Sequence, residues 1–361
     1  MPMTILFITP YPFDQAPSQR FRFEQYFEVL KRNDWEISQE SFLDSKTWAI
    51  FYKKGMLLSK LWGIAKGIIR RHLLFFKLHR YDLIFIHREA CFIGPPYFEW
   101  IYANVFKKKI IFDFDDAIWL RDVSEANSRL SFLKRSEKTA KIIKYSSFII
   151  AGNDYLGDYA RLYNNHVTII PTTIDTNYHR SGNNTSSRIR IGWTGSITTN
   201  KHFEMLIPLL KKLNEHYGDK IEFITISNKP TANGGLPINY IKWNRDSEIK
   251  DLQKIDIGIM PLPDDEWAKG KCGFKGLQYM ALEIPTIMSP VGVNTEIIQD
   301  GINGYLATTE QEWFDKLSLL IESKELREKI GKSGRTTVQD KYSVEANKQK
   351  YLQLFNQLIS R

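Results

Sequence analysis

Short, uninterrupted apolar runs recur along the whole chain, and most of them end in a polar or Gly/Pro-containing turn that leads into amphipathic helical spacing. A short apolar run bounded by turn residues is typical of a strand that is buried on both faces of a parallel sheet. Strands of this kind that alternate with helices predict a doubly wound α/β architecture. Because 361 residues correspond to about two domains, we expect two such α/β halves. The expected strands are residues 4–9, 81–87, 107–112, 147–151, 167–170, 189–193, 221–226, 240–243, 256–260 and 286–288.

The composition is that of an ordered protein. Apolar residues make up 43% and charged residues 25% of the chain, which are ordinary values for a globular protein. Residues 1–14 are expected to be a short strand and turn, because they lack the basic start and the long apolar core of a signal peptide. No uncharged apolar run is long enough to cross a bilayer. Cys91 and Cys272 match no metal-binding spacing and fit a reducing compartment, so we expect a cytoplasmic protein.

The net charge of +9 indicates a polyanionic partner. Nucleotides, anionic lipids and nucleic acids are the candidates for that partner. The sequence has no zinc-finger, RRM-type or KH-type motif. We therefore expect no nucleic-acid partner, and we retain nucleotides and anionic lipids.

Residues 270–307 contain the clearest local signal for a ligand. Residues 270–273 form a loop rich in Gly and Lys that opens a helical run over residues 274–282. A Gly-rich loop before a helix presents unpaired backbone N–H groups and the positive end of the helix dipole to an anion. Lys271 and Lys275 add formal positive charge at this point. The local chemistry fits a diphosphate site, but it also fits an ordinary loop–helix–strand unit with two surface lysines.

The order of motifs across this segment separates the two interpretations. Gln278-Tyr279-Met280-Ala281 is followed by Ile284-Pro285-Thr286-Ile287, then by Glu296 and by Asp300-Gly301-Ile302-Asn303-Gly304. This series resembles the nucleotide-sugar half of GT-B glycosyltransferases, in particular the large retaining family four. The resemblance spans nearly the whole chain and is weakest over residues 42–80. It implies the α/β GT-B fold, in which two doubly wound Rossmann-like domains face each other across a cleft.

Two positions depart from the pattern of that family. The family has a pair of glutamates where this chain has Gly270 and Gln278. Asp265 or Glu266, from the preceding loop, could substitute for the first glutamate. The resemblance implies that Gln278 binds the donor ribose, since an amide can both donate and accept hydrogen bonds. It also implies that Glu296 contacts a donor hydroxyl or the loop beneath it.

The resemblance implies a second part of the donor site, in the loop after residues 189–193. In the family a Gly-Arg pair and a later Lys hold the donor diphosphate. Gly195 and Lys201 match the Gly and the Lys, whereas Ser196 stands in place of the Arg. We expect Lys275 to supply the missing charge, so that Lys201 and Lys275 neutralise the leaving diphosphate during catalysis. The family generally needs no bound metal, and we expect no cofactor.

Charged residues at the expected strand ends of the N-terminal half indicate the acceptor side. Open α/β sheets bind ligands at the carboxyl ends of their strands. Arg20 and Arg22 follow the first strand, and we expect one of them to meet a phosphate of the donor or acceptor; the alternative is a solvated first helical turn. His87, Arg88 and Glu89 lie at the end of another strand and are expected near the acceptor. Alternatively, His87 is a core histidine, and Arg88 and Glu89 form a surface pair.

Three carboxylates, on Asp113, Asp115 and Asp116, stand together after the strand at residues 107–112. Burying like charges this close together is costly unless a proton, a cation or hydrogen bonds offset the repulsion. We expect Asp115 or Asp116 to be a catalytic base or a contact to an acceptor hydroxyl, in place of a His that the family often has there. The spacing also resembles the metal-binding Asp-x-Asp of the other major glycosyltransferase fold, but the GT-B resemblance argues against a metal. A helix N-cap with a solvent-facing pair is the remaining alternative.

The segment at residues 53–80 is the most basic part of the chain and contains no Asp or Glu. Apolar residues recur there at three- and four-residue spacing, so we expect an amphipathic helix. A basic helix with Trp and Phe on its other face is typical of a helix at an anionic membrane surface. The alternative is a helix that packs on the sheet with a solvated basic face. The basic residues are Lys53, Lys54, Lys60, Lys66, Arg70, Arg71, Lys77 and Arg80.

These features divide the chain into an N-terminal acceptor-side domain at residues 1–178, a polar linker at 179–187 and a C-terminal nucleotide-sugar-binding domain at 188–343. The last helix, residues 344–361, is expected to pack back on the first domain. The resemblance implies a retaining glycosyltransferase with a UDP- or GDP-sugar donor. A lipid-linked or saccharide acceptor, bacterial surface-polysaccharide assembly and a peripheral location at the inner face of the cytoplasmic membrane complete this hypothesis.

Two other hypotheses stay open. A GT-B nucleotide-sugar epimerase would release free sugar or epimer without using an acceptor. A non-catalytic nucleotide-sugar-binding or membrane-binding protein would bind the donor without turnover. The loss of the glutamate pair, at Gly270 and Gln278, and of the arginine, at Ser196, favours this last hypothesis.

Overall fold

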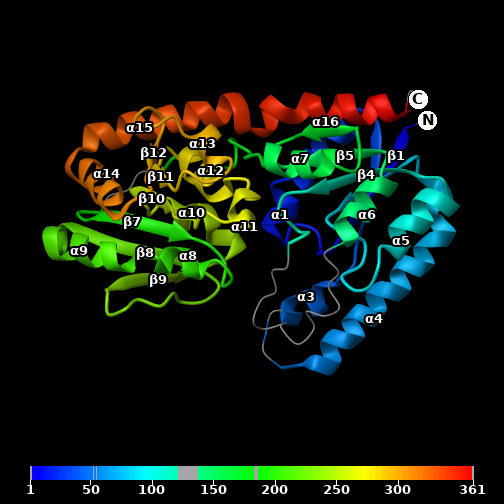
Figure 1. Cartoon of the computed structure of the whole chain (residues 1–361), viewed down its shortest axis with the longest axis horizontal. Helices are drawn as coiled ribbons and strands as arrows, with labels where there is room; N and C mark the ends of the chain where they lie inside the picture. The colour runs from blue at the N-terminus through cyan, green and yellow to red at the C-terminus, as the bar shows by residue number, and fades with distance from the viewer. Residues whose placement is uncertain (1, 52, 54, 121–136, 183–185, 360–361) are drawn as a thin grey trace. The chain divides into compact units, whose positions relative to one another are not determined.

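The computed structural model describes residues 2–51, 53, 55–120, 137–182 and 186–359. Lys54, residues 183–185 of the expected linker and residues 360–361 of the expected last helix lie outside the described residues. The chain divides into two compact units (Figure 1). Unit 1 is Met1–Thr172 with Lys348–Arg361, and unit 2 is Thr173–Asn347.

Unit 1 is built on a six-stranded sheet in the order β2-β1-β3-β4-β5-β6, in which neighbouring strands are parallel. The central strands coincide with the apolar runs, and Ile5, Phe7 and Phe85 are fully buried between the covering helices. The strands are β1 (Met3–Thr9), β2 (Trp35–Ser41), β3 (Leu83–His87), β4 (Lys109–Phe114), β5 (Phe148–Ala151) and β6 (Val167–Ile169).

Helices of very different length cover this sheet (Figure 1). The two longest are α4 (Leu57–Leu74) and α16 (Val344–Ile359), and α16 contributes its part from Lys348 onward to unit 1. The others are α1 (Pro17–Arg20), α2 (Phe27–Lys31), α3 (Ser45–Phe51), α5 (Tyr97–Trp100), α6 (Lys138–Tyr145) and α7 (Asp154–Arg161).

Unit 2 repeats the plan with a second six-stranded parallel sheet, in the order β12-β11-β10-β7-β8-β9. Its core joins Ile191 and Trp193 of the sheet to Leu210 and Leu317 of the helices. The strands are β7 (Ile189–Thr194), β8 (Ile221–Ser227), β9 (Ile238–Lys242), β10 (Ile257–Met260), β11 (Thr286–Met288) and β12 (Tyr305–Leu306). The helices are α8 (Asn200–Glu204), α9 (Ile207–Tyr217), α10 (Glu248–Leu252), α11 (Glu266–Lys269), α12 (Phe274–Ala281), α13 (Asn294–Ile297), α14 (Glu310–Glu322) and α15 (Lys324–Thr337).

The division between the units falls at Thr172, before the expected boundary at residue 178. Ile174 forms an isolated parallel bridge with Ser343, and Arg335 donates a hydrogen bond of 2.9 Å to the carbonyl oxygen of His179. His179 is fully buried. The start of the expected linker is therefore packed into unit 2, because its backbone groups find hydrogen-bond partners there.

Candidate active site

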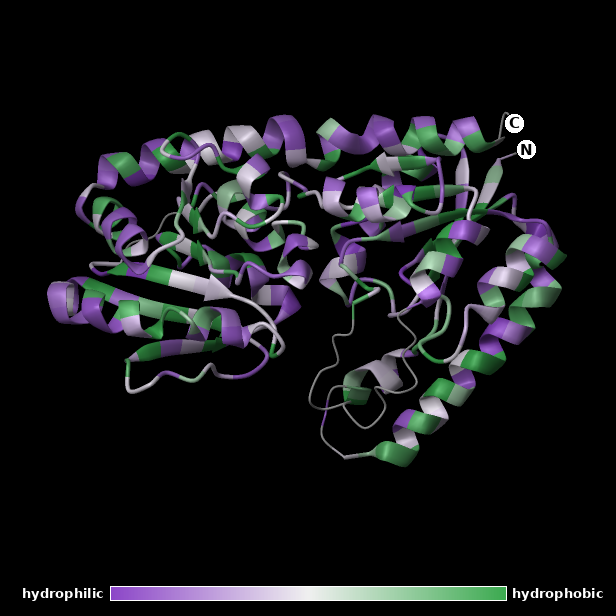
Figure 2. Ribbon diagram, viewed as in Figure 1, coloured by the Kyte–Doolittle hydropathy of each residue, from purple (hydrophilic) through white to green (hydrophobic). Residues whose placement is uncertain are grey.

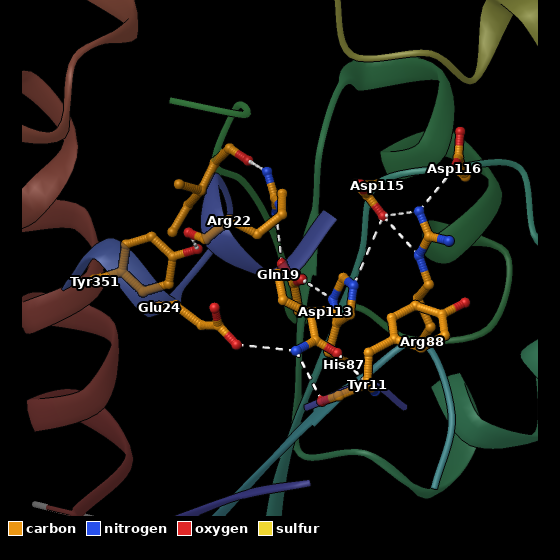
Figure 3. Close-up of polar contacts among 11 residues, drawn as sticks. Tyr11, Gln19, Arg22, Glu24, His87, Arg88, Asp113, Asp115, Asp116 and Tyr351 are labelled. Atoms are coloured by element: carbon orange, nitrogen blue, oxygen red, sulfur yellow. Dashed lines mark hydrogen bonds and ion pairs between the residues drawn. The ribbon is translucent and has the colours of Figure 1, made fainter. Parts of the chain in front are cut away.

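His87 and Asp113 meet at the carboxyl edge of the unit 1 sheet, where the parallel register of β3 and β4 pairs them. Both side chains are fully buried, and His87 Nδ1 lies 2.7 Å from Asp113 Oδ2 (Figure 3). An ionised carboxylate can only accept hydrogen bonds, so a neutral ring in this pair carries its proton on Nδ1. The other nitrogen, Nε2, is buried without a hydrogen-bond partner among the described residues and lies 4.0 Å from Asp115 Oδ1. The Nε2 side of the ring therefore faces Asp115.

Arg22 is the counter-ion of the buried Asp113. Its guanidinium lies 2.5 Å from Asp113 Oδ1 and also donates to the carbonyl oxygen of Ile170. Burial raises the pKa of Asp113, but the charge of Arg22 and the hydrogen bond from His87 more than offset this, so the pKa lies below its ordinary value. Arg22 is itself fully buried. Arg22 thus holds Asp113 in the structure, and a phosphate contact by Arg22 stays a prediction.

Arg88 holds Asp115 and Asp116 at the same edge of the sheet (Figure 3). Its Nη2 lies 2.7 Å from Asp115 Oδ1 and 2.7 Å from Asp116 Oδ2, and its Nε lies 2.9 Å from Asp115 Oδ1. Although burial lowers the pKa of Arg88, the two aspartates raise it well above its ordinary value. The backbone of Arg88 has a φ of 59°, in the left-handed region that residues other than glycine rarely adopt. Strain of this kind persists where the surroundings hold it, and it is concentrated at functional sites.

The three aspartates are thus balanced by protein cations on separate sides. Asp113 faces Arg22 and His87, whereas Asp115 and Asp116 face Arg88. Within the described ranges, no group of three or more His, Cys, Asp or Glu side chains is placed to hold a metal ion. Asp115 and Asp116 keep 12% and 17% of their side-chain surface exposed, while Asp113 is fully buried. Asp115 and Asp116 are therefore the members of this cluster that can accept a hydrogen bond from a sugar hydroxyl.

The two remaining acceptor-side residues are held in other ion pairs. Arg20 Nε lies 3.3 Å from Asp14 Oδ1, and the Arg20 side chain is mostly buried. Glu89 lies 3.0 Å from the Nζ of Lys138, which is also mostly buried. Neither residue is a simple solvated surface charge, and their contact with an acceptor stays a prediction.

In unit 2, Trp193 and Gly195 shape the loop that follows β7. Trp193 is fully buried, and a Cβ atom on Gly195 would lie 2.2 Å from its ring. Only glycine therefore allows the loop to follow this path. The Ser196 backbone N–H donates to Thr199 Oγ1 at 3.0 Å, and the Ser196 hydroxyl lies 2.9 Å from Thr198 Oγ1. The result is a compact, hydroxyl-rich turn that leads into α8.

Positive charge converges on His202, next to this loop. Lys201 and His202 lie on α8, Lys275 lies on α12, and Lys271 lies in the loop before α12. Burial, and after it the charges of Lys275, Lys201 and Lys271, lower the pKa of His202 to about 4. The Nζ of Lys275 lies 5.6 Å from the centroid of the Trp193 ring, which ties the cluster to the Gly195 loop. Like charges gathered in this way repel one another, so an anion bound among them is stabilised.

The N-terminus of α12 adds the positive end of a helix dipole to the same cluster. Gly273, with a φ of 65°, is its N-cap residue, and glycine has no side chain that could cap the helix. The positive end of a helix dipole favours an anion at such a terminus. Lys271 Nζ lies 4.8 Å from the centroid of the Trp267 ring. The structure therefore brings together five of the expected donor-site residues: Gly195, Ser196, Lys201, Lys271 and Lys275.

Gln278 and Glu296 have different surroundings. Gln278 is almost fully buried, with its Nε2 at 3.4 Å from both Glu248 Oε1 and His179 Nε2. A ribose contact through Gln278 would therefore have to rearrange this buried set. Glu296 is exposed in the first turn of α13. Asp265, considered as a substitute for the missing glutamate, accepts a hydrogen bond from Ala268 N as the N-cap of α11.

His202 is a functional candidate that sequence reasoning did not place in the site, whereas Arg88 was expected near the acceptor from its position at the end of β3. His202 directly follows Lys201 in a segment with helical spacing, and nothing in the sequence distinguishes it from a histidine packed in the core. Only the fold shows that α8 and α12 surround this ring with lysines.

Comparison with known proteins identifies related folds. Residues 188–323 match the family model described as glycosyl transferases group 1. No curated protein sequence matches the chain. Sucrose-phosphate synthase from Thermosynechococcus elongatus has a similar structure, with a TM-score of 0.70, 13% identity and 99% of each chain covered. A glycosyltransferase from Rickettsia africae gives a TM-score of 0.70, 14% identity and 99% coverage of each chain. HepE from Anabaena, in complex with UDP and glucose, gives a TM-score of 0.69 and 14% identity, with 98% of this chain and 100% of the HepE chain covered.

Proposed function

We propose that the chain, which has the GT-B fold, is a glycosyltransferase that moves a sugar from a UDP- or GDP-sugar to a lipid-linked or saccharide acceptor, with retention of the anomeric configuration. The observation that carries the proposal is the convergence of Lys201, Lys271 and Lys275 beside the Gly195 loop. HepE, which is similar in fold, was solved with UDP and glucose. A nucleoside diphosphate is therefore the ligand that we assign to this cluster.

The cluster supplies what breaking the glycosidic bond to a diphosphate requires. Negative charge grows on the leaving diphosphate as the bond breaks. Positively charged groups that are already in place stabilise this charge without the reorganisation that water would need. Lys201 and Lys275 provide the cations, and the start of α12 provides the positive end of a helix dipole. Because two lysines and a helix N-terminus can carry this charge, we propose that the reaction needs no metal ion.

Asp115 and Asp116 are proposed to receive the acceptor. Both reach solvent and are oriented by Arg88, so either can accept a hydrogen bond from the attacking hydroxyl. Retention is proposed to follow from attack on the same face that the diphosphate leaves, without a nucleophile from the protein. Bacterial surface-polysaccharide assembly is a process that uses such transfers, and we propose it as the context of the reaction.

The outer face of α4 supports a lipid-linked acceptor. Leu58, Trp62, Ile69 and Leu73 of α4, and Phe76 of the 3-10 helix that follows it (Phe75–Arg80), are exposed at helical spacing, while Ile64 and Leu74 face the protein. Figure 2 shows apolar residues on the ribbon of α4 from its first turn onward. The exposed fractions of Leu58, 83%, and Phe76, 78%, are large for such apolar side chains. An unpartnered apolar stripe of this kind marks an interaction surface.

Basic side chains flank this stripe, which favours anionic lipid as its partner. Lys53, Lys66, Lys77 and Arg80 are exposed, and the whole segment lacks acidic residues. Each basic residue near an anionic bilayer contributes about 1 kcal/mol of attraction. No helix in the described part of the chain combines the length and apolarity that crossing a bilayer requires. We propose that α4 lies along the cytoplasmic membrane surface and brings the site to a lipid-linked acceptor.

The experiment that tests the proposed reaction follows nucleotide release from UDP-glucose and GDP-mannose, first without acceptor and then with vesicles that contain a polyprenyl-phosphate-linked sugar. The expected product keeps the α configuration of the donor sugar, as read by NMR of its anomeric proton. A β-linked product would contradict retention. Donor binding without release under either condition would favour a non-catalytic protein, and release of an altered free sugar without acceptor would favour an epimerase.

A further inference from the structure

His202 is a buried histidine whose ring lacks the partner that a buried polar group normally has. Only 3% of its surface is exposed, and its Nδ1 is buried without a hydrogen-bond partner among the described residues. Leaving a buried nitrogen unpaired costs about 1–3 kcal/mol, so such a group calls for an explanation. Its neighbour Phe203 packs against Trp193, with ring centroids 5.7 Å apart, which fixes α8 against the Gly195 loop.

Four charged residues, on or next to α8, α11 and α12, act on His202. Lys201 is its neighbour on α8, Lys271 and Lys275 belong to the loop and first turn of α12, and Asp265 caps α11. The three lysines disfavour a protonated ring, whereas Asp265 favours it to a smaller extent. The imidazole is therefore neutral while the lysine cluster holds no anion.

We propose that His202 belongs to the diphosphate site and takes up a proton from solvent when the diphosphate of a nucleotide binds among Lys201, Lys271 and Lys275. This inference rests on the proposed function, because it requires the lysines to hold a diphosphate. The bound anion cancels the field of the three lysines. The imidazolium then has two N–H donors, so that Nδ1 can donate a hydrogen bond in the nucleotide-bound state.

The physical consequence is a nucleotide affinity that rises as the pH falls. Protonation that is favoured only in the bound state tightens binding below the pKa of the bound state, by linkage. If the anion returned His202 from a pKa of about 4 to an ordinary value of about 6.5, the affinity would rise about tenfold between pH 7.5 and pH 5.5. Burial opposes the charged ring in both states, so tenfold is the upper limit of the effect.

The test is an NMR titration of the histidine ring protons of the full chain, with and without saturating UDP or GDP, whichever binds. The His202 signal is assigned by its absence in His202→Gln. We expect its pKa to rise by at least one unit on nucleotide binding, which corresponds to tenfold or more in proton affinity. The exposed His216 on α9 provides the internal control, and its titration should not change.

Calorimetric affinities at pH 7.5 and 5.5 complete the test. The gain in affinity at low pH should be several-fold larger in the wild type and in His216→Gln than in His202→Gln or His202→Asn. The phosphate of UDP also titrates in this range, and comparison between variants cancels its contribution. Nucleotide binding with an unmoved His202 titration overturns this inference and leaves the proposed function intact. Failure of both nucleotides to bind at either pH overturns the proposed function and this inference with it.

Discussion

At the level of single residues, the two units contain different kinds of charged cluster: a buried ion pair in unit 1 and a group of lysines in unit 2. In unit 1, Asp113 and Arg22 are fully buried and neutralise each other. In unit 2, Lys201, Lys271 and Lys275 act together on a buried neutral histidine. The first arrangement pairs opposite charges within the protein, and we propose that an anion binds at the second.

Lys275→Ala and Lys201→Ala should each lower kcat by about 10²–10³, because each removes one charge that stabilises the leaving diphosphate. Nucleotide release from the donor sugar that proves active measures the effect. Lys212→Ala is the matched control, since Lys212 is exposed and pairs with Glu310 away from the cluster. Circular dichroism should show that all three variants are folded. Wild-type turnover in both site variants would reject the diphosphate assignment.

Asp113→Asn should destabilise unit 1 by about 3–5 kcal/mol at pH 7, because it leaves the buried Arg22 without its counter-ion. The pKa of Asp113 is lowered in the folded state, so its contribution is present above the unfolded pKa of about 3.9 and is lost as the pH falls through the lower folded value. The difference between wild type and variant should therefore shrink below pH 4, as measured by urea unfolding. Asp219→Asn is the control, because that carboxylate is 97% exposed. Equal stability of the Asp113 variant and this control at pH 7 would contradict the account.

The sequence predicted where the polar residues of unit 1 lie, but not which contacts they make. The cluster at Asp113, Asp115 and Asp116 was expected to need cations or hydrogen bonds, and the structure supplies them. Arg20 or Arg22 was expected at a phosphate, and the ion pair of Arg22 with Asp113 was not foreseen because Asp113 lies far away in the sequence and on another element. Arg88 was expected near the acceptor, but its orientation depends on a left-handed backbone, which a sequence pattern does not reveal.

Among the elements, α4 departs most from an ordinary covering helix. Its inner face carries Gly67, where a Cβ would lie 2.7 Å from the Phe42 carbonyl oxygen, and the fully buried Arg71. Arg71 donates to the carbonyl oxygens of Ala90, Glu40 and Thr9. The sequence predicted an amphipathic helix, but periodicity could not tell which of its apolar residues face outward. Because glycines and a carbonyl-bound arginine occupy the inner face, several of the large apolar side chains face out.

The combined variant Leu58→Ser, Trp62→Ser and Phe76→Ser should reduce binding to vesicles that contain phosphatidylglycerol by at least tenfold. Full burial of each such side chain is worth about 1.5–3 kcal/mol, and tenfold in affinity corresponds to about 1.4 kcal/mol. Vesicle flotation measures the binding. Leu319→Ser is the control, because Leu319 is half-exposed on α14 of unit 2. Undiminished flotation of the combined variant would remove α4 as the membrane-binding element.

At the scale of the whole molecule, the predicted GT-B fold is confirmed, with two parallel six-stranded sheets and the structural similarity to glycosyltransferases. Most strands were predictable because buried parallel strands are continuous apolar runs. The strand β2 was missed because it is an edge strand that is polar after Ile37, and most of its residues are half-buried. The boundary at Thr172 was missed because backbone pairing with residues near 343 is not visible locally.

Unit 1 is discontinuous in sequence, and α16 completes it. Tyr351 donates to the Arg22 carbonyl oxygen at 2.8 Å and its ring lies 4.3 Å from that of Tyr26, while Phe355 packs against Trp35 and Phe85. Removal of residues 348–361 should therefore abolish the thermal transition of unit 1. Phe355→Ala should cost about 3–5 kcal/mol, and Gln353→Ala on the exposed face of the same helix should cost little. A truncated chain that unfolds like the full one would show that α16 is dispensable.

We propose that unit 2 binds a nucleoside diphosphate through its lysine cluster. The thermal shift of the whole chain with UDP, GDP and their sugars, in the presence and absence of EDTA, tests this binding most directly. A ligand at 100 times its Kd stabilises the folded state by about 2.7 kcal/mol. We predict a clear rise in Tm with one of the two nucleotides, unchanged by EDTA and absent from the Lys201→Ala, Lys275→Ala double variant. No shift with any nucleotide, or the same shift in the double variant, would contradict the account.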